Sequence, residues 1–322
     1  MRRYNFYVFT AAVVILGLLV ILPQLLSTYY VGLMTLMLIY AIFAMSLDIL
    51  LGYTGMFSLG HSALWGGAAY MVGILNVKVL QGSHFALELS AGLFFAALLA
   101  ACFGLLVLRT KGIYFPMLTL ALSLTLWGIP FQMRLFAGGG YGIPGISRPV
   151  LGVIPWNLGV TNNYYYFVFI FFIIATALMY LIVKCPFGHA LKGIRESETR
   201  MRSLGYNVWL YKYLAFIIGG VFAGLAGILL TYYTTFVGPN QLHILYSFEA
   251  VLMVVLGGPG TLFGPALGAC IITFAKNTIS SYTQHWTLVV GIIYILVVAF
   301  FPKGIGNLIR QNIKKRMQPW NY

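Results

Sequence analysis

Charge is what this sequence has least of. Only 7% of its 322 residues are Asp, Glu, Lys or Arg, and just five are acidic. Soluble domains carry roughly 25% charged residues, so a water-soluble fold is excluded. The hydrophobic fraction of 61% suits a lipid bilayer, which requires apolar runs of about 20 residues per crossing. The sequence therefore predicts an all-α integral membrane protein with a single transmembrane domain over residues 1–322.

Several catalytic signatures are also missing. There is no phosphate-binding loop of the form G-x-x-x-x-G-K-[ST], no H-E-x-x-H zinc motif and no G-x-S-x-G elbow around Ser58. The three cysteines lack disulfide or metal spacing. We expect no catalytic residue, metal or cofactor in this chain. An intramembrane enzyme built on Ser58 and His61 stays open as an alternative.

Apolar runs recur along the whole chain. We predict ten membrane-spanning helices, at residues 5–22, 29–51, 60–76, 85–108, 113–133, 164–183, 213–233, 246–257, 264–282 and 285–301. With both termini in the cytoplasm, fifteen of the nineteen Lys and Arg residues lie on the inner side, as the positive-inside tendency requires. The outer side receives only Lys78, Arg134, Arg148 and Lys276. The net charge of +14 thus reflects membrane topology, and we expect no nucleic-acid partner.

Two polar, glycine-rich stretches interrupt the apolar runs. The first seam, residues 52–70, follows Asp48, and the second seam, residues 257–265, follows Glu249. Irregular backbone at membrane depth occurs only inside protein or beside a water-filled path, and an acid within a span is a functional candidate. We therefore predict a translocation path or hinge at Asp48, Gly52, Tyr53, Thr54, Gly55, Ser58, Gly60, His61, Glu249, Gly257, Gly258, Gly260 and Gly264. Helix packing for the glycines, and structural hydrogen bonds for Asp48, His61 or Glu249, are the alternatives.

Two connections between spans are long enough to carry a function. Residues 184–212 form a basic inner loop that predicts a short amphipathic helix, with Pro186 in its first turn and Gly205 at its end. Its apolar residues need a surface, which is lipid, the same chain or a partner protein. Residues 137–163 form an outer loop rich in Gly and Pro, which predicts turns. This outer loop either faces a partner, covers the path or simply connects two spans.

Four segments together resemble one known family. They are LLGYTGMFSLGHSALWGGAAY, LRTKGIYFPMLTLAL, CPFGHALKGIRESETRMRSLGYNVWLYKYLAF and SFEAVLMVVLGGPGTLFGPALGA. In this order, over about residues 30–305, they are similar to the permease subunits of branched-chain amino-acid ABC importers. The resemblance implies a bundle of ten helices in the bacterial cytoplasmic membrane. It also implies three kinds of partner: a second related permease in a heterodimer, two cytoplasmic ATPase subunits that carry ATP and Mg, and an extracytoplasmic binding protein.

The resemblance also implies that residues 184–212 couple the permease to the ATPase. We assign that coupling element to Phe187, Gly188, Ala190, Leu191, Ile194, Arg195, Glu196 and Gly205. One departure is that Thr199, Arg200 and Met201 stand where importer permeases often carry Glu-Ala-Ala.

Branched-chain amino acids are the solutes that the resemblance favours. A permease for urea, amides or other amino acids stays open, as does a secondary transporter that uses Asp48 or Glu249 as its ion site.

Overall fold

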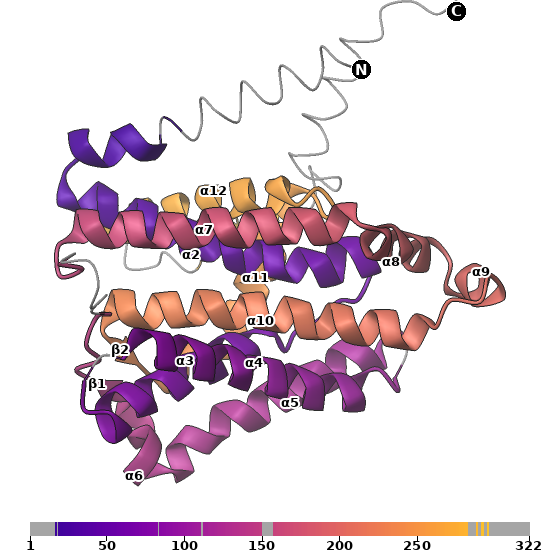
Figure 1. Ribbon diagram of the computed structural model, residues 1–322, viewed down its shortest axis with the longest axis horizontal. Coiled ribbons are helices and arrows are strands. Elements are labelled where there is room, and N and C mark those ends of the chain that lie inside the picture. The colour runs from indigo at the N-terminus through magenta and orange to yellow at the C-terminus, as the bar shows by residue number, and fades with distance from the viewer. Residues whose placement is uncertain are drawn as a thin grey trace, which may run out of the picture.

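The computed structural model describes residues 17, 19–82, 84–110, 112–149 and 157–282, together with 288, 291, 292 and 295. Its long helices run nearly side by side in one bundle (Figure 1). Along the chain the elements are α2 (Thr28–Asp48), η1 (Ile49–Thr54), α3 (His61–Ile74), η2 (Leu75–Val79), α4 (Phe85–Val107), α5 (Tyr114–Gln132), α6 (Arg134–Ala137), η3 (Gly139–Tyr141), β1 (Ile143–Pro144), α7 (Thr161–Lys184), α8 (Pro186–Glu196), α9 (Glu198–Ser203), α10 (Val208–Thr234), β2 (Phe236–Val237), η4 (Pro239–Leu242), α11 (Ile244–Gly257) and α12 (Phe263–Tyr282).

Five of these helices are long and apolar enough to cross a membrane: α2 with η1, α4, α5, α7 and α10. They make the chain a multi-pass membrane protein. The shorter helices α3 and α11, and the helix α12, occupy the three other predicted spans between residues 29 and 282. The first and tenth predicted spans lie almost entirely outside the described residues, as do both termini, so the count of ten and the cytoplasmic termini stay predictions.

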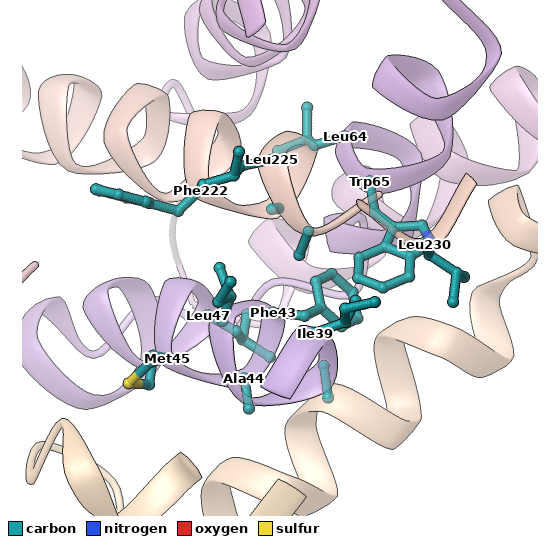
Figure 2. Packing of buried hydrophobic residues seen from close by; sticks show 14 of the residues in the cluster. Ile39, Phe43, Ala44, Met45, Leu47, Leu64, Trp65, Phe222, Leu225 and Leu230 are labelled. Atoms are coloured by element: carbon teal, nitrogen blue, oxygen red, sulfur yellow. The ribbon is translucent and has the colours of Figure 1, made fainter. Parts of the chain in front are cut away.

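Helices α2 and α10 form the centre of the bundle. In each, 78% of the most apolar window is buried inside the protein, against 22–33% in α4, α5 and α7. Figure 2 shows side chains of α2, α3 and α10 packed together, including Phe43, Trp65 and Phe222. A methyl group on Gly224 of α10 would overlap the methyl group of Ala96 in α4. The small residues of α10 therefore serve close packing within this chain.

The two ends of the bundle differ. Helices α8 and α9 lie at one end, and the small sheet of β1 and β2 lies at the other (Figure 1). In this antiparallel sheet Ile143 pairs with Val237. Under the predicted topology the α8 end is cytoplasmic and the sheet end is extracytoplasmic.

The described part of the outer loop is built from turns, as predicted. Gly138, Gly142 and Gly145 have positive φ angles, which glycine adopts without strain. Arg148 donates hydrogen bonds to the carbonyl oxygens of Leu158 and Gly159, at 2.9 and 3.0 Å. This guanidinium therefore ties the two described arms of the loop together.

Candidate functional site

The first glycine-rich seam breaks the helical path, as its sequence predicts. The π-helix η1 ends at Thr54, the next residue Gly55 has a φ of +75°, and α3 begins only at His61. Helix α3 has 14 residues and continues directly into the π-helix η2, which ends at Val79. Helix α11 has 14 residues, or roughly 21 Å at about 1.5 Å per residue, which is shorter than the bilayer core of about 30 Å. An interrupted helix and a short helix thus stand among full-length spans, an arrangement typical of transport sites.

The first turns of α3 and α11 meet through buried hydroxyl groups. The Ser62 backbone N–H donates to Ser247 Oγ at 2.8 Å, and Ser62 Oγ lies 3.1 Å from Ser123 Oγ of α5. The Leu59 N–H donates to Thr119 Oγ1, also of α5, at 3.1 Å. Our sequence analysis did not single out these hydroxyl residues. Thr119 and Ser123 stand four apart in an apolar span, a spacing that could have indicated one polar helix face.

The two seams are joined by Asp48, at what we call the seam junction: Asp48, Gly52, Gly260 and Leu262. Asp48 Oδ1 accepts the backbone N–H of Gly260 at 2.7 Å, and Oδ2 accepts that of Leu262 at 3.2 Å. The Asp48 side chain is completely buried. A Cβ atom on Gly52 would overlap the Asp48 carboxylate and the Gly260 nitrogen, so only glycine fits there. Two predicted path segments therefore form one packed unit.

Helix α8 contacts this junction directly. The Arg195 guanidinium donates a hydrogen bond to the Gly52 carbonyl oxygen. The Lys192 ammonium lies 5.1 Å from the centre of the Tyr53 ring, a cation–π distance. A Cβ atom on Gly260 would lie 3.0 Å from Arg195 Nη1. The structure thus brings together two sets of residues that the sequence analysis predicts separately, the coupling element and the path.

The inner loop contains two helices, where the sequence predicted one. Ser197 has an extended conformation between α8 and α9, and its Oγ accepts the Arg200 N–H at 3.3 Å. The helix therefore restarts at Ser197 because this serine is an N-cap. Gly205 has a φ of +86° and follows α9, which fits its predicted place at the helix end.

The apolar face of α8 is covered by its own chain. Leu191 and Ile194 are fully buried, and Gly188 lies so close to the Val183 backbone that a Cβ atom would overlap it. Phe187 stacks on Tyr211 at 5.5 Å, and Ala190 packs with Ile194. The apolar face of α8 therefore packs against its own chain, which is one of the three surfaces considered above beside lipid and a partner protein. The exposed members of the predicted coupling element are Arg195, Glu196 and Gly205.

Glu249 of the second path segment has a different environment from Asp48. Its Oε1 lies 2.5 Å from the Lys276 ammonium of α12. The Glu249 and Lys276 side chains are 19% and 29% exposed. Lys276 is predicted on the outer side of the membrane, and in the structure it pairs with an acid from a neighbouring helix.

His61 is buried at the start of α3. Its Nε2 lies 2.8 Å from Ser46 Oγ of α2, and its ring stacks on Phe43 at 5.4 Å. These contacts join α2 to α3. They fit the structural alternative that we kept for this histidine.

The remaining predicted path residues mainly shape the backbone. Thr54 Oγ1 donates to the Leu50 carbonyl at 2.5 Å, and Ser58 Oγ accepts the Gly60 N–H at 3.4 Å. Gly60 abuts the Thr119 backbone. In the second seam Gly258 has a φ of +98°, and the backbones of Gly257 and Gly264 approach too closely for a Cβ atom. No cluster of His, Cys, Asp or Glu that could hold a metal exists within the described stretches of the chain.

Glu88 is a second fully buried acid, and we did not predict it as a site residue. Its Oε1 accepts hydrogen bonds from Asn76 Nδ2 and the His84 N–H, both at 3.0 Å. Tyr232 of α10 donates to Glu88 Oε2 at 2.5 Å. Asn76 also holds the outer loop, because its Oδ1 accepts the Ser147 N–H at 2.9 Å. A lone acid within an apolar run was the available signal.

Comparison with known proteins gives this arrangement a family context. The permease component model of the branched-chain amino acid transport system matches residues 29–299. The permease protein LivM of the high-affinity branched-chain amino acid transport system of Escherichia coli K12 is 27% identical over 327 aligned positions, which cover 94% of this chain and 76% of LivM. LivH of the same system in Salmonella typhimurium is 25% identical over 83% of this chain and 90% of its own length.

One more distant relative has a different solute in its name. The autoinducer 2 import system permease LsrC of Photorhabdus laumondii is 27% identical over 45% of each chain. No solved structure matches the chain. The family model covers most of the sequence, including both seams, the coupling element and the Glu249 segment. The chain therefore belongs to the permease component family of branched-chain amino acid transport systems and is a membrane permease subunit of an ABC importer.

Proposed function

We propose that this chain is one of two related permeases in a bacterial cytoplasmic-membrane importer for branched-chain amino acids. In this assembly two cytoplasmic ATPase subunits, which hold ATP and Mg, drive the permeases, and an extracytoplasmic binding protein delivers the solute. Residues 137–163 face that binding protein, and residues 184–212 face the ATPase. The names of LivM and LivH support the solute class, because both belong to branched-chain amino acid systems.

The observation that carries this proposal is the contact between α8 and the seam junction. Arg195 lies on the exposed side of α8, yet its guanidinium reaches the Gly52 carbonyl within η1. Gly52 in turn packs against Asp48, whose carboxylate holds the second seam through Gly260. A displacement of α8 by a bound ATPase would therefore reach both glycine-rich seams through direct contacts. This is a physical route from nucleotide hydrolysis to a change in the membrane path.

The structure offers less support for a secondary transporter that uses Asp48 as its ion site. Each Asp48 carboxylate oxygen already accepts a backbone N–H, and the side chain is completely buried. An ion would have to reach a fully enclosed carboxylate and share its oxygens with both N–H donors.

The proposal is tested by purifying the tagged chain with its partners from native membranes and measuring leucine uptake in reconstituted vesicles. We expect an ATPase to copurify, and uptake to require ATP and the binding protein. Rapid leucine flux through the isolated chain, without any partner, would contradict the proposal. So would uptake of urea in place of leucine.

A substitution tests the route through α8. Arg195→Ala removes a charged hydrogen bond of about 1.5–3 kcal/mol, so uptake should fall about tenfold or more while the ATPase stays bound. Arg109→Ala, at an exposed position between α4 and α5 and outside the 184–212 segment, is the matched control and should transport normally. Equal uptake by both variants, at the unaltered rate, would show that the Arg195 contact does not transmit the movement.

A further inference from the structure

The Glu249–Lys276 ion pair lies far from the inner end of the helical bundle. Lys276 is thirteen residues from the start of α12, or about 20 Å along the helix at about 1.5 Å per residue. Glu249 is eight residues from the end of α11, or about 12 Å. Under the predicted topology both distances are measured from the inner end of the bundle. The pair therefore sits at the level of the hydrocarbon core.

The pair is also accessible from outside the chain. The Glu249 side chain is 19% exposed and that of Lys276 is 29% exposed, whereas Asp48 and Glu88 have no exposed surface. Tyr40 of α2 and Tyr246 of α11 both lie close enough to Glu249 to interact with it electrostatically, and both are also only partly buried. A charged side chain at this depth faces a bundle interior or an aqueous cavity, because contact with lipid is too costly. The surface of α11 and α12 around this pair is therefore not a lipid-facing surface.

The chemistry of the pair matches one class of solute. A free amino acid crosses as a zwitterion, with an ammonium and a carboxylate joined by one carbon atom. Glu249 offers an acceptor for an ammonium group, and Lys276 offers donors for a carboxylate. Their closest atoms are 2.5 Å apart, so a zwitterion that inserts between them exchanges one ion pair for two. Each charge then keeps a partner throughout the passage, which avoids the cost of an unpaired charge at this depth of the membrane.

We propose that Glu249 and Lys276 form the zwitterion contact of the translocation path, with the solute's ammonium on Glu249 and its carboxylate on Lys276. This inference rests on the proposed function and adds the residue Lys276, the orientation of the solute and the chain surface that borders the path. The competing arrangement is a dry interface with the second permease, in which a partner subunit covers the pair and no solute reaches it.

Thiol accessibility separates these two arrangements. In a chain with Cys102, Cys185 and Cys270 replaced by serine, Glu249→Cys and Lys276→Cys are introduced singly, and the complete importer is treated with a charged methanethiosulfonate reagent. Phe274→Cys is the matched control: Phe274 lies on the same helix as Lys276 and is 50% exposed, but it is apolar and should face lipid. We expect both path cysteines to react, leucine with its binding protein to slow that reaction, and Phe274→Cys to stay unmodified. Lack of reaction at 249 and 276, or equal reaction at all three sites, would overturn the proposal.

Transport by conservative variants gives a second readout. Glu249→Gln and Lys276→Met each remove a charge-assisted contact, so leucine uptake should fall about ten- to a hundredfold while the partner ATPase still copurifies. Unaltered uptake in either variant would overturn the zwitterion contact and leave the importer function intact. Loss of the ATPase from both variants would instead identify a structural pair and also overturn it. The wild-type complex is measured in parallel, and absence of leucine uptake there would overturn the proposed function itself.

Discussion

Asp48 and Glu249 have similar sequence contexts but opposite environments. Each is a lone acid within an apolar helix, and Asp48 lies four residues and Glu249 eight residues before a glycine-rich seam. Asp48 is fully buried, and both of its oxygens accept backbone N–H groups from the other seam. Glu249 remains partly exposed and faces a lysine. The difference teaches that similar sequence contexts place one acid in a closed set of backbone hydrogen bonds and the other in a partly exposed ion pair.

The largest effect on folding should come from the buried acid. Asp48→Ala leaves the Gly260 and Leu262 N–H groups without their acceptor, so the free energy of unfolding should fall by about 3–5 kcal/mol. The loss of stability is measured by heating the purified chain in detergent and recording how much of the monodisperse species remains at each temperature. A variant as stable as the wild type would show that the seam junction does not depend on its carboxylate.

A smaller loss of unfolding free energy should follow from placing a methyl group beside Asp48. Gly52→Ala places a methyl group onto the carboxylate and the Gly260 nitrogen, an overpacking that costs about 1–3 kcal/mol. Gly128→Ala in α5 is the matched control, because no atom lies within 4 Å of its added Cβ. Alanine there should leave the protein as stable or stabilise it by up to about 1 kcal/mol. The same unfolding assay compares them, and equal melting temperatures would argue against close packing at the junction.

The smallest effect on folding should come from the partly exposed acid. Glu249→Gln keeps a hydrogen-bond acceptor for Lys276 but removes the ion pair. Because both side chains are partly exposed, the free energy of unfolding should change by less than about 1 kcal/mol. The same unfolding assay measures this variant beside Asp48→Ala. If the two cost the same, the distinction between a structural and a solute-facing acid fails.

Hydropathy predicted the helices of the described region well. The predicted span 29–51 corresponds to α2 with η1, and the predicted span 85–108 corresponds to α4. The predicted and observed bounds differ by a few residues. This succeeds because the cost of placing unpaired backbone groups in lipid acts on every local stretch of chain. The inner loop shows the limit of periodicity. Its apolar spacing predicted one helix, but the N-cap preference of Ser197 divides it into α8 and α9.

The individual roles of the site residues could be predicted less well. Leu204 is an apolar residue of the predicted amphipathic segment, yet it is 66% exposed, whereas Leu191 of the same segment is fully buried. Glu88 and the Ser62 hydroxyl cluster were not singled out, because single polar residues in apolar runs do not reveal their partners. The contact of Arg195 with Gly52 joins positions 143 residues apart, and no local pattern specifies such a pair.

The amino-acid sequence by itself determined that this protein lies in a lipid bilayer, where its apolar helices lie along the chain and where glycine-rich segments interrupt them. These properties follow from local hydropathy and backbone freedom. Only the tertiary structure decided which acid is enclosed and which is open. Asp48 meets its partner 212 residues away at Gly260, and Glu249 meets Lys276 on the next helix. Such pairings depend on how the helices pack, and packing is a property of the whole bundle.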